Sequence, residues 1–171
     1  MRRLVGGLAV TAVTVVACLV VLELLLRLVG IGYPEFYRAD PVLGRSHLEG
    51  ARGWWTKEGG SWVAINGAGL RDHERPVAKP AGTFRVAVLG DSYAAAFEVP
   101  FEAGFTQVLE RQLAACPALD GQAVDVLNFG LGGMGTAGQY LMLEERVWAY
   151  APDLVLLAFL TGNDVTDKVR T

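Results

Sequence analysis

The sequence predicts an α/β fold with a parallel sheet, preceded by an N-terminal transmembrane helix. From residue 84 onward, three short apolar segments alternate with two amphipathic ones, which is typical of strands alternating with helices. Each apolar segment runs into a polar or glycine-rich loop. Residues 4–22 contain no charged side chain, which predicts a membrane span. The 171 residues suit one modest domain with such an appendage.

The N-terminal segment has the length of a membrane span. As a helix rising about 1.5 Å per residue, residues 4–22 would cross a hydrocarbon core of about 30 Å. Glu23 and Arg27 follow four residues apart, so they can pair on one helix face near the far interface. Beyond them we expect an aromatic belt at the membrane interface, formed by Tyr33, Phe36 and Tyr37.

A cleavable signal peptide is the alternative interpretation of this segment. Its apolar core would be about 7–15 residues long and would end at a small-x-small site. Here the run is longer and no such site follows, so we expect an uncleaved, single-pass signal anchor over residues 1–30. Because Arg2 and Arg3 precede the span, the positive-inside rule places the N-terminus in the cytoplasm. The rest of the chain would then lie outside that membrane, in the periplasm or at the cell surface.

Charge and cysteine content exclude several classes of function. The formal net charge is −3 and no basic patch is present, so no nucleic-acid partner is expected. Cys18 and Cys116 each stand alone, and Cys18 lies inside the apolar run, so neither a disulfide nor a metal-ligand spacing is expected. We expect no metal and no cofactor.

Residues 31–83 form a juxtamembrane segment rich in glycine and tryptophan. Residues 54–56 and 61–65 are predicted to be two short strands joined by a turn at residues 57–60. The tryptophans of this hairpin either pack onto the main domain, which we favour, or form an exposed surface on which sugars stack. They are Trp54, Trp55 and Trp62.

Residues 84–171 contain the predicted sheet. The expected order is strand, helix, strand, helix, strand, over residues 84–89, 102–115, 123–127, 136–150 and 154–159. Continuous apolar strands that alternate with helices imply a parallel sheet covered on both faces. Ligand sites of such sheets form at the carboxyl ends of the strands, so the three loops that follow the strands are expected to meet there.

Ser92 is the candidate nucleophile, because it follows the first strand directly. A serine hydroxyl is a weak nucleophile at neutral pH and needs a base, usually histidine, together with donors for the developing oxyanion. The backbone N–H of Ser92, a glycine N–H from the second loop and the amide of Asn163 in the third loop are candidate donors. The alternative is that these side chains only cap helices or close turns.

The three loops together resemble the conserved blocks of SGNH (GDSL-like) hydrolases. Gly90-Asp91-Ser92-Tyr93 is similar to block I, which carries the nucleophilic serine. The segment 128–133 is similar to block II, and aligning it on its asparagine gives the oxyanion role to Gly133. Thr161-Gly162-Asn163-Asp164 resembles block III and implies Asn163 as the third donor, although Thr161 replaces the family's first glycine. For Asp91 the resemblance implies only a structural role.

The resemblance covers about residues 84–164 and implies a flavodoxin-like three-layer sandwich. The family's catalytic base and its partner lie in a late Asp-x-x-His block, and no Asp-x-x-His occurs in this chain. His47 and His73 both precede the sheet, and neither is expected to be the base. We therefore expect residues 84–171 to be the N-terminal part of the hydrolase domain, incomplete at the C-terminus. A three-stranded sheet of this kind would leave an apolar edge exposed.

These observations leave three hypotheses for function. The first is a serine-dependent ester hydrolase that acts on acyl or acetyl esters outside the membrane, without a cofactor. The second is an O-acetyltransferase that modifies a cell-envelope polysaccharide, in which a glycan instead of water attacks the acyl-enzyme. The expected substrate is an ester or an O-acetylated glycan. The third is a non-catalytic, membrane-tethered binding module whose tryptophans form the contact surface.

Overall fold

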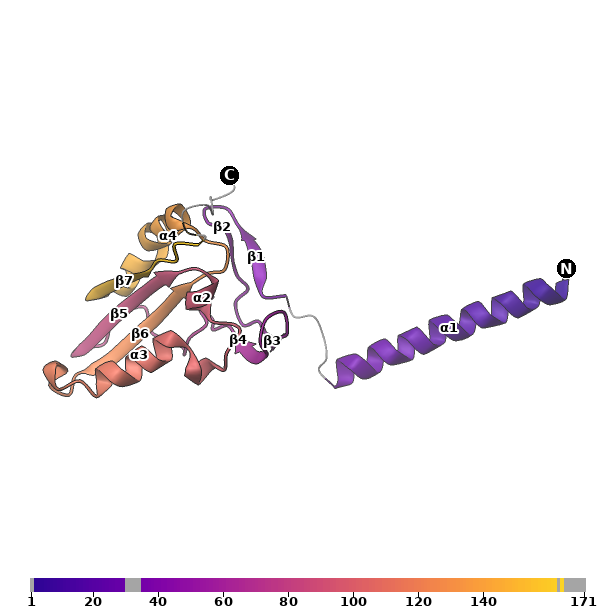
Figure 1. Cartoon of the computed structure of the whole chain (residues 1–171), viewed down its shortest axis with the longest axis horizontal. Helices are drawn as coiled ribbons and strands as arrows, with labels where there is room; N and C mark the ends of the chain where they lie inside the picture. The colour runs from indigo at the N-terminus through magenta and orange to yellow at the C-terminus, as the bar shows by residue number, and fades with distance from the viewer. Residues whose placement is uncertain (1, 30–34, 163, 165–171) are drawn as a thin grey trace. The chain divides into compact units, whose positions relative to one another are not determined.

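The structure is a computed structural model that describes residues 2–29, 35–162 and 164, with side chains from residue 5 onward. The chain forms two compact units, Met1–Tyr33 and Pro34–Thr171. The first contains one long helix, and the second contains two small hairpins, short helices and a parallel sheet (Figure 1).

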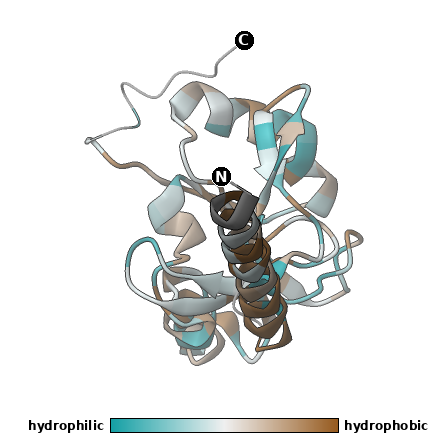
Figure 2. Ribbon diagram, turned by 90° about the vertical axis from the view of Figure 1, so that its right-hand side faces the viewer, coloured by the Kyte–Doolittle hydropathy of each residue, from teal (hydrophilic) through white to brown (hydrophobic). Residues whose placement is uncertain are grey.

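Helix α1 (Arg2–Leu28) forms the N-terminal unit. Its segment Val5–Leu28 contains a window of 18 residues with a mean hydropathy of 2.6, and it is apolar over most of its length (Figure 2). By length and composition it is able to cross a membrane, and a signal sequence has the same properties. The expected ion pair forms, with Arg27 Nε donating to Glu23 Oε1 at 2.7 Å. A long apolar N-terminal helix is thus confirmed.

Strands β1 (Tyr37–Asp40) and β2 (Gly44–His47) form an antiparallel hairpin that the sequence pattern did not predict. The Asp40 carboxylate closes its turn by accepting hydrogen bonds from two backbone N–H groups, at 2.9 and 3.0 Å. The predicted aromatic belt is wrong for Phe36, which is 2% exposed and packs edge-on against Phe97. It is also wrong for Tyr37, which is half-buried against the same ring. Tyr33 lies outside the described residues.

Strands β3 (Arg52–Trp55) and β4 (Ser61–Ala64) form the predicted tryptophan hairpin. Alternation along the strands turns Trp55 towards an apolar cluster, while Trp54 and Trp62 face outward from paired positions. The two outward rings meet edge to face, with centroids 5.9 Å apart, and are 54% and 50% exposed. The expectation that all three tryptophans pack onto the domain is therefore correct for Trp55 only.

The sheet consists of three parallel strands, β5 (Thr83–Gly90), β6 (Ala123–Gly130) and β7 (Leu154–Ala158). Their order is β6-β5-β7, so the first strand along the chain lies in the centre. This confirms the predicted alternation and places all three carboxyl ends at one edge (Figure 1).

Helical segments connect the strands and pack on the sheet. Helix α2 (Ser92–Ala95), a 3₁₀ turn (Phe101–Ala103), helix α3 (Phe105–Ala114) and a second 3₁₀ turn (Pro117–Leu119) lead from β5 to β6. Helix α4 (Thr136–Met142) continues as a π-helix (Leu143–Val147) and a 3₁₀ turn (Trp148–Tyr150) before β7. The helix predicted over residues 102–115 thus begins slightly later than expected, at Phe105. The helix predicted over residues 136–150 changes from α to π and then to 3₁₀ along its length.

The two faces of the sheet contact different segments. Alternate residues of β5 and β6, including Val86, Val88 and Val126, pack against Leu109 and Leu113 of α3. The intervening residues pack against the segment that begins with α4 and against residues from the N-terminal part of the same unit. They are Ala87, Leu89, Leu127 and Phe129. The second unit is accordingly a mixed α/β structure.

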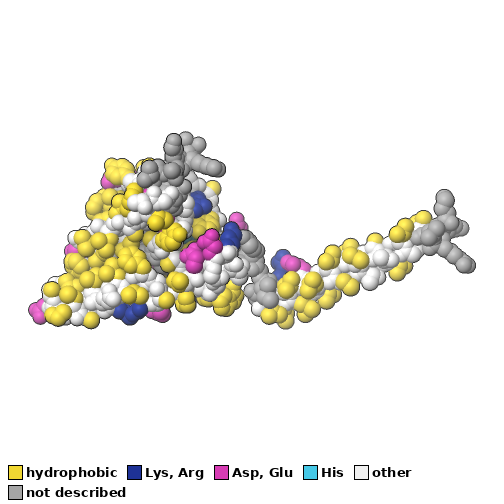
Figure 3. Space-filling model, viewed as in Figure 1, with side chains coloured by type: hydrophobic (Ala, Val, Ile, Leu, Met, Phe, Trp, Pro, Cys, Tyr) yellow, Lys and Arg dark blue, Asp and Glu magenta, His cyan; other side chains and the backbone are white. Residues whose placement is uncertain are grey.

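Strand β7 forms an exposed edge of the sheet, as expected. Its Leu154 and Leu157 are 43% and 49% exposed, whereas Val86 and Val88 of the central strand are fully buried. Hydrophobic side chains gather over this part of the second unit (Figure 3). An apolar edge strand is thus left uncovered among the described residues.

Candidate functional site

Ser92 lies at the carboxyl edge of the sheet, two residues after β5 ends. It is the first residue of α2 and is half-buried. The preceding Asp91 is 1% exposed, and its carboxylate accepts a hydrogen bond from Tyr93 N at 2.9 Å. This bond fixes the turn between β5 and α2, which agrees with a structural role for Asp91.

Two glycines allow α2 to lie directly on the ends of the strands. A Cβ atom on Gly90 would stand 2.6 Å from Ala94 Cβ, and one on Gly130 would stand 2.4 Å from Ala95 N. Both distances are far below any normal contact between heavy atoms, so a side chain at either position would push α2 away. The glycines at the ends of β5 and β6 therefore set the position of Ser92.

The loop after β6 lies against Ser92. Leu131 N donates to Gly90 O at 3.0 Å, which joins the second loop to the first. A Cβ atom on Gly132 would stand 3.5 Å from Ser92 Cβ, so this loop passes next to the nucleophile candidate. Gly133 has φ of +71°, a conformation that glycine adopts without strain. Two of the three predicted loops are thus in contact.

Asn128 joins the two loops through its side chain. Its Nδ2 donates to Ala94 O at 2.9 Å, and its Oδ1 accepts from Gly130 N at 2.9 Å. Asn128 is 3% exposed, so both bonds are shielded from water. The sequence marked this residue as the end of a strand and the start of the second block, and in the structure its amide holds α2 against the second loop.

The third loop is described only in part, because Asn163 lies outside the described residues. Asp164 is 2% exposed and accepts from Leu160 N at 2.7 Å and from Gln139 Nε2 at 3.2 Å. Its backbone carbonyl accepts from the Thr136 hydroxyl at 3.1 Å. The third loop is therefore hydrogen-bonded to α4. The predicted third oxyanion donor, Asn163, is not part of the described structure.

Arg71, which the sequence did not single out, holds the end of α2. It is 2% exposed, and its guanidinium donates to Ala96 O, to Ala95 O at 3.2 Å and to Val99 O at 2.7 Å. Burial lowers the pKa of Arg71 to about 10, so the side chain stays charged at neutral pH. The carbonyls at the end of α2 are thus satisfied by a buried cation.

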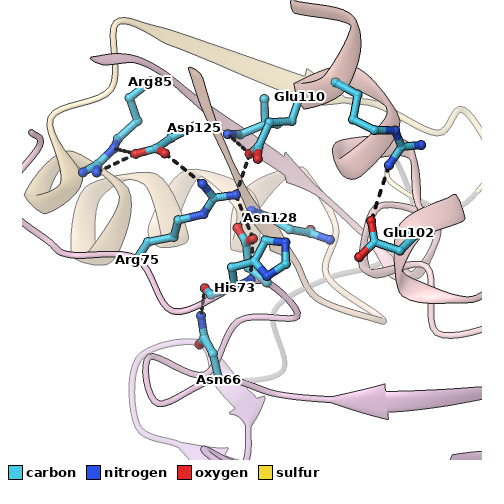
Figure 4. Close-up of polar contacts among 11 residues, drawn as sticks. Asn66, His73, Arg75, Arg85, Glu102, Glu110, Asp125 and Asn128 are labelled. Carbon is cyan, nitrogen blue, oxygen red and sulfur yellow. Dashed lines mark hydrogen bonds and ion pairs between the residues drawn. The ribbon is translucent and has the colours of Figure 1, made fainter. Parts of the chain in front are cut away.

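A buried ion-pair network connects the segment after Arg71 to the sheet (Figure 4). Arg75 meets Glu110 of α3 at 2.5 Å and Asp125 of β6 at 2.8 Å, and Asp125 also meets Arg85 of β5 at 2.8 Å. Asp72 pairs with Arg75 at 3.4 Å and accepts from Asn128 N at 3.2 Å. Burial raises the pKa of the Asp72 carboxyl despite this pairing. The network joins residues 72–75 to β6, whose end carries the second loop.

Neither histidine is hydrogen-bonded to Ser92 in the described part of the chain. His47 is 3% exposed, and its Nδ1 lies 3.2 Å from Gly69 O. A carbonyl only accepts, so Nδ1 carries the proton. The buried Nε2, which has no hydrogen-bond partner among the described residues, is unprotonated. Burial, aided by nearby arginines, lowers the pKa of His47 to about 4. His73 is exposed and lies edge-on to Phe101.

The unpredicted hairpin β1–β2 brings two more polar side chains to this edge. The point at which a Gly132 Cβ would stand is 3.2 Å from Tyr37 Oη and 3.4 Å from Arg45 Nη2. Burial raises the pKa of the Tyr37 hydroxyl, which therefore remains protonated at neutral pH. Hairpin β1–β2 thus forms one side of the candidate site, although no sequence motif marked it.

Comparisons of the chain with protein-family models, with curated proteins and with solved structures found no match. Residues of the described part form no cluster of three potential metal ligands.

Proposed function

We propose that residues 84–171 belong to a serine-dependent ester hydrolase of the SGNH type, with a flavodoxin-like three-layer fold. Ser92 is the nucleophile, and the backbone of Gly133 and the amide of Asn163 are oxyanion donors. The substrates are acyl or acetyl esters. The proximity of the first two loops carries the proposal: Leu131 N donates to Gly90 O at 3.0 Å, and a Cβ atom on Gly132 would stand 3.5 Å from Ser92 Cβ, at the carboxyl edge of a parallel sheet.

In the proposed reaction the first loop provides the nucleophile, and the later loops provide oxyanion donors. Ser92 Oγ attacks the ester carbonyl, its proton passes to a base, and the tetrahedral oxyanion accepts hydrogen bonds from the loop donors. The alcohol then leaves, and water resolves the acyl-enzyme. Because neither His47 nor His73 is bonded to Ser92, the proposal requires a base from outside the described residues.

A fluorophosphonate probe tests the assignment of Ser92, because it labels only an activated serine. We expect the protein expressed from its complete gene, held in detergent micelles, to be labelled in its native state. Ser92→Ala should abolish labelling. Ser46→Ala, which removes a buried hydroxyl from β2, is the matched control and should retain it. Equal labelling of Ser92→Ala and the wild type would rule out Ser92.

We also propose that α1 is an uncleaved signal anchor, with the N-terminus in the cytoplasm and the second unit outside the membrane. Its mean hydropathy of 2.6 over a window of 18 residues supports a span, and the two arginines that precede the apolar run support this orientation.

A binding module is the second candidate, and the exposed pair Trp54 and Trp62 favours it. Two solvent-facing indole rings at paired positions offer a surface on which sugar rings stack. Titration with chitotetraose, followed by tryptophan fluorescence, tests this function. We expect a change that the Trp54→Ala/Trp62→Ala double variant loses while remaining folded. A titration without any change would reject a sugar-binding role for the pair.

A further inference from the structure

Arg45 of β2 lies beside the candidate nucleophile. If Gly132 carried a Cβ atom, that atom would stand 3.4 Å from Arg45 Nη2 and 3.5 Å from Ser92 Cβ. Arg45 Nη2 and Ser92 Cβ therefore cannot be farther apart than the sum of these two distances. Arg45 Nη2 also stands 2.6 Å from the Cβ position on Gly133, so a side chain there would displace the guanidinium. Consecutive glycines thus provide the space that the Arg45 head group occupies.

The guanidinium of Arg45 has no carboxylate within ion-pair distance among the residues that the structure describes. Several other arginines of the second unit are paired, for example Arg75 and Arg85 with Asp125 and Arg146 with Asp40. Arg45 is exposed and contributes to the positive field that lowers the pKa of His47. Its planar fork of donors is therefore available to a ligand, and such a fork binds carboxylates and phosphates with two parallel hydrogen bonds.

Arg45 is held in place by the hairpin that carries it. Its Cζ atom lies 4.8 Å from the centroid of the Tyr37 ring, a cation–π contact between neighbouring strands. The hairpin turn is closed by Asp40, which also pairs with Arg146 at 2.5 Å. A ligand that binds Arg45 therefore meets a side chain that is already supported, which lowers the entropic cost of binding.

We infer that Arg45 selects esters that carry an anionic oxygen group, such as a carboxylate or phosphate, close to the ester bond. This inference rests on the proposed role of Ser92. The Arg45 guanidinium lies next to the position that a Cβ atom on Gly133 would take. The N–H bond of Gly133 starts from the backbone nitrogen and not from the Cα atom that would carry this Cβ. Arg45 thus contacts a substituent of the substrate on that side of the loop.

Two acetyl esters of the same shape test this specificity. They are 3-acetoxybenzoate, which is anionic, and 3-acetoxybenzamide, which is neutral. We expect the wild-type protein, expressed from its complete gene and held in detergent, to have the higher kcat/KM for the anion. In Arg45→Gln the ratio of the two kcat/KM values should fall about 10- to 100-fold, the loss expected for a hydrogen-bonded charge pair. In Arg45→Lys this ratio should lie between those of the wild type and of Arg45→Gln, because lysine keeps the positive charge but lacks the planar fork of donors.

The control is Arg111→Gln, which removes an exposed guanidinium from α3 and should leave the ratio as in the wild type. Two results would overturn the inference: equal losses on both esters in Arg45→Gln, or no preference for the anion in the wild type. Equal losses would instead make Arg45 an oxyanion donor. Hydrolysis of both esters that persists in Ser92→Ala would overturn the proposed function as well, so the two failures are distinguishable.

Discussion

The side-chain amide of Asn128 donates a hydrogen bond to the backbone carbonyl of Ala94 at 2.9 Å. This bond crosses from the end of β6 to α2, and it fixes the helix that begins with Ser92. Its partner bond, from Gly130 N to Asn128 Oδ1, orients the amide. A single buried side chain thus sets the distance between the two loops of the candidate site.

Replacing this amide by an apolar group of similar size is expected to destabilise the second unit. Asn128→Leu leaves a buried carbonyl and a buried N–H without partners, which should cost about 2–4 kcal/mol in free energy of unfolding. Urea unfolding in detergent, followed by tryptophan fluorescence, measures this loss, because all four tryptophans lie in the second unit. Gln122→Leu makes a comparable change at an exposed position and should stay within about 0.5 kcal/mol of wild type. Similar small effects in both variants would contradict the role of Asn128.

Adding one methyl group at Gly130 should displace α2. The Cβ of Gly130→Ala would meet Ala95 N at 2.4 Å, and backbone does not move aside as a flexible side chain does. We expect a loss of about 1–3 kcal/mol in unfolding free energy, together with weaker fluorophosphonate labelling of Ser92. Gly60→Ala is the control, because nothing lies within 4 Å of the added atom. Full labelling of Gly130→Ala would show that the packing of α2 does not govern the nucleophile.

The free energy of unfolding should decrease as the pH is lowered, because of His47. Burial, aided by Arg45, Arg146 and Arg71, lowers the pKa of His47 to about 4, from about 6.5 in an unfolded chain. The unfolded state therefore binds more protons between these values, so stability rises with pH across that window and is lost on acidification. Between pH 7.5 and pH 5 the His47 contribution should fall by about 2 kcal/mol.

Comparing urea midpoints at these two pH values in His47→Gln isolates that contribution. The variant should lose about 2 kcal/mol less than the wild type between pH 7.5 and pH 5. The same substitution at the exposed His73 should leave the wild-type pH dependence in place. An unchanged pH dependence in His47→Gln would mean that His47 is not held neutral by its surroundings.

The orientation of the anchor can be tested with a cysteine at an exposed position. Ala81 is exposed in the segment that precedes β5. In a Cys116→Ala background, Ala81→Cys should react with a membrane-impermeant maleimide in intact cells. Labelling of permeabilised cells, in which the maleimide reaches both sides of the membrane, serves as the reference for complete reaction. Reaction only after permeabilisation would place the second unit on the cytoplasmic side and reject the proposed topology.

The sequence pattern predicted the regular part of the fold well. Strands β5, β6 and β7 and the helices between them were expected, because continuous apolar segments alternate with amphipathic ones. The hairpin β1–β2 was missed, since its strands are short and mostly polar and lack the alternation that marks a half-buried strand. Phe36 was assigned to a membrane interface because sequence position alone does not tell a core ring from an interfacial one.

The ion pairs between charged residues of the core could not be predicted from the sequence either. Arg85 interrupts an apolar strand, and only the pairing of β5 with β6 places Asp125 opposite it. Ser92 and Gly133 could be named from motifs, because such motifs record chemistry at a fixed spacing. Arg45 and Arg71 could not, and neither could the bond from Asn128 to Ala94, because these roles depend on contacts between segments distant in the chain.

The central position of β5 has a consequence for the order of folding during synthesis. β5 pairs with β6 through Val86 and Val126, and with β7 through Val86 and Leu154. The turn that carries Ser92 is therefore synthesised before either neighbouring strand. Such non-local pairing closes long loops and is slow. The central apolar strand consequently waits unpaired until β6 and β7 follow, and the candidate nucleophile acquires its surroundings only when those later strands arrive.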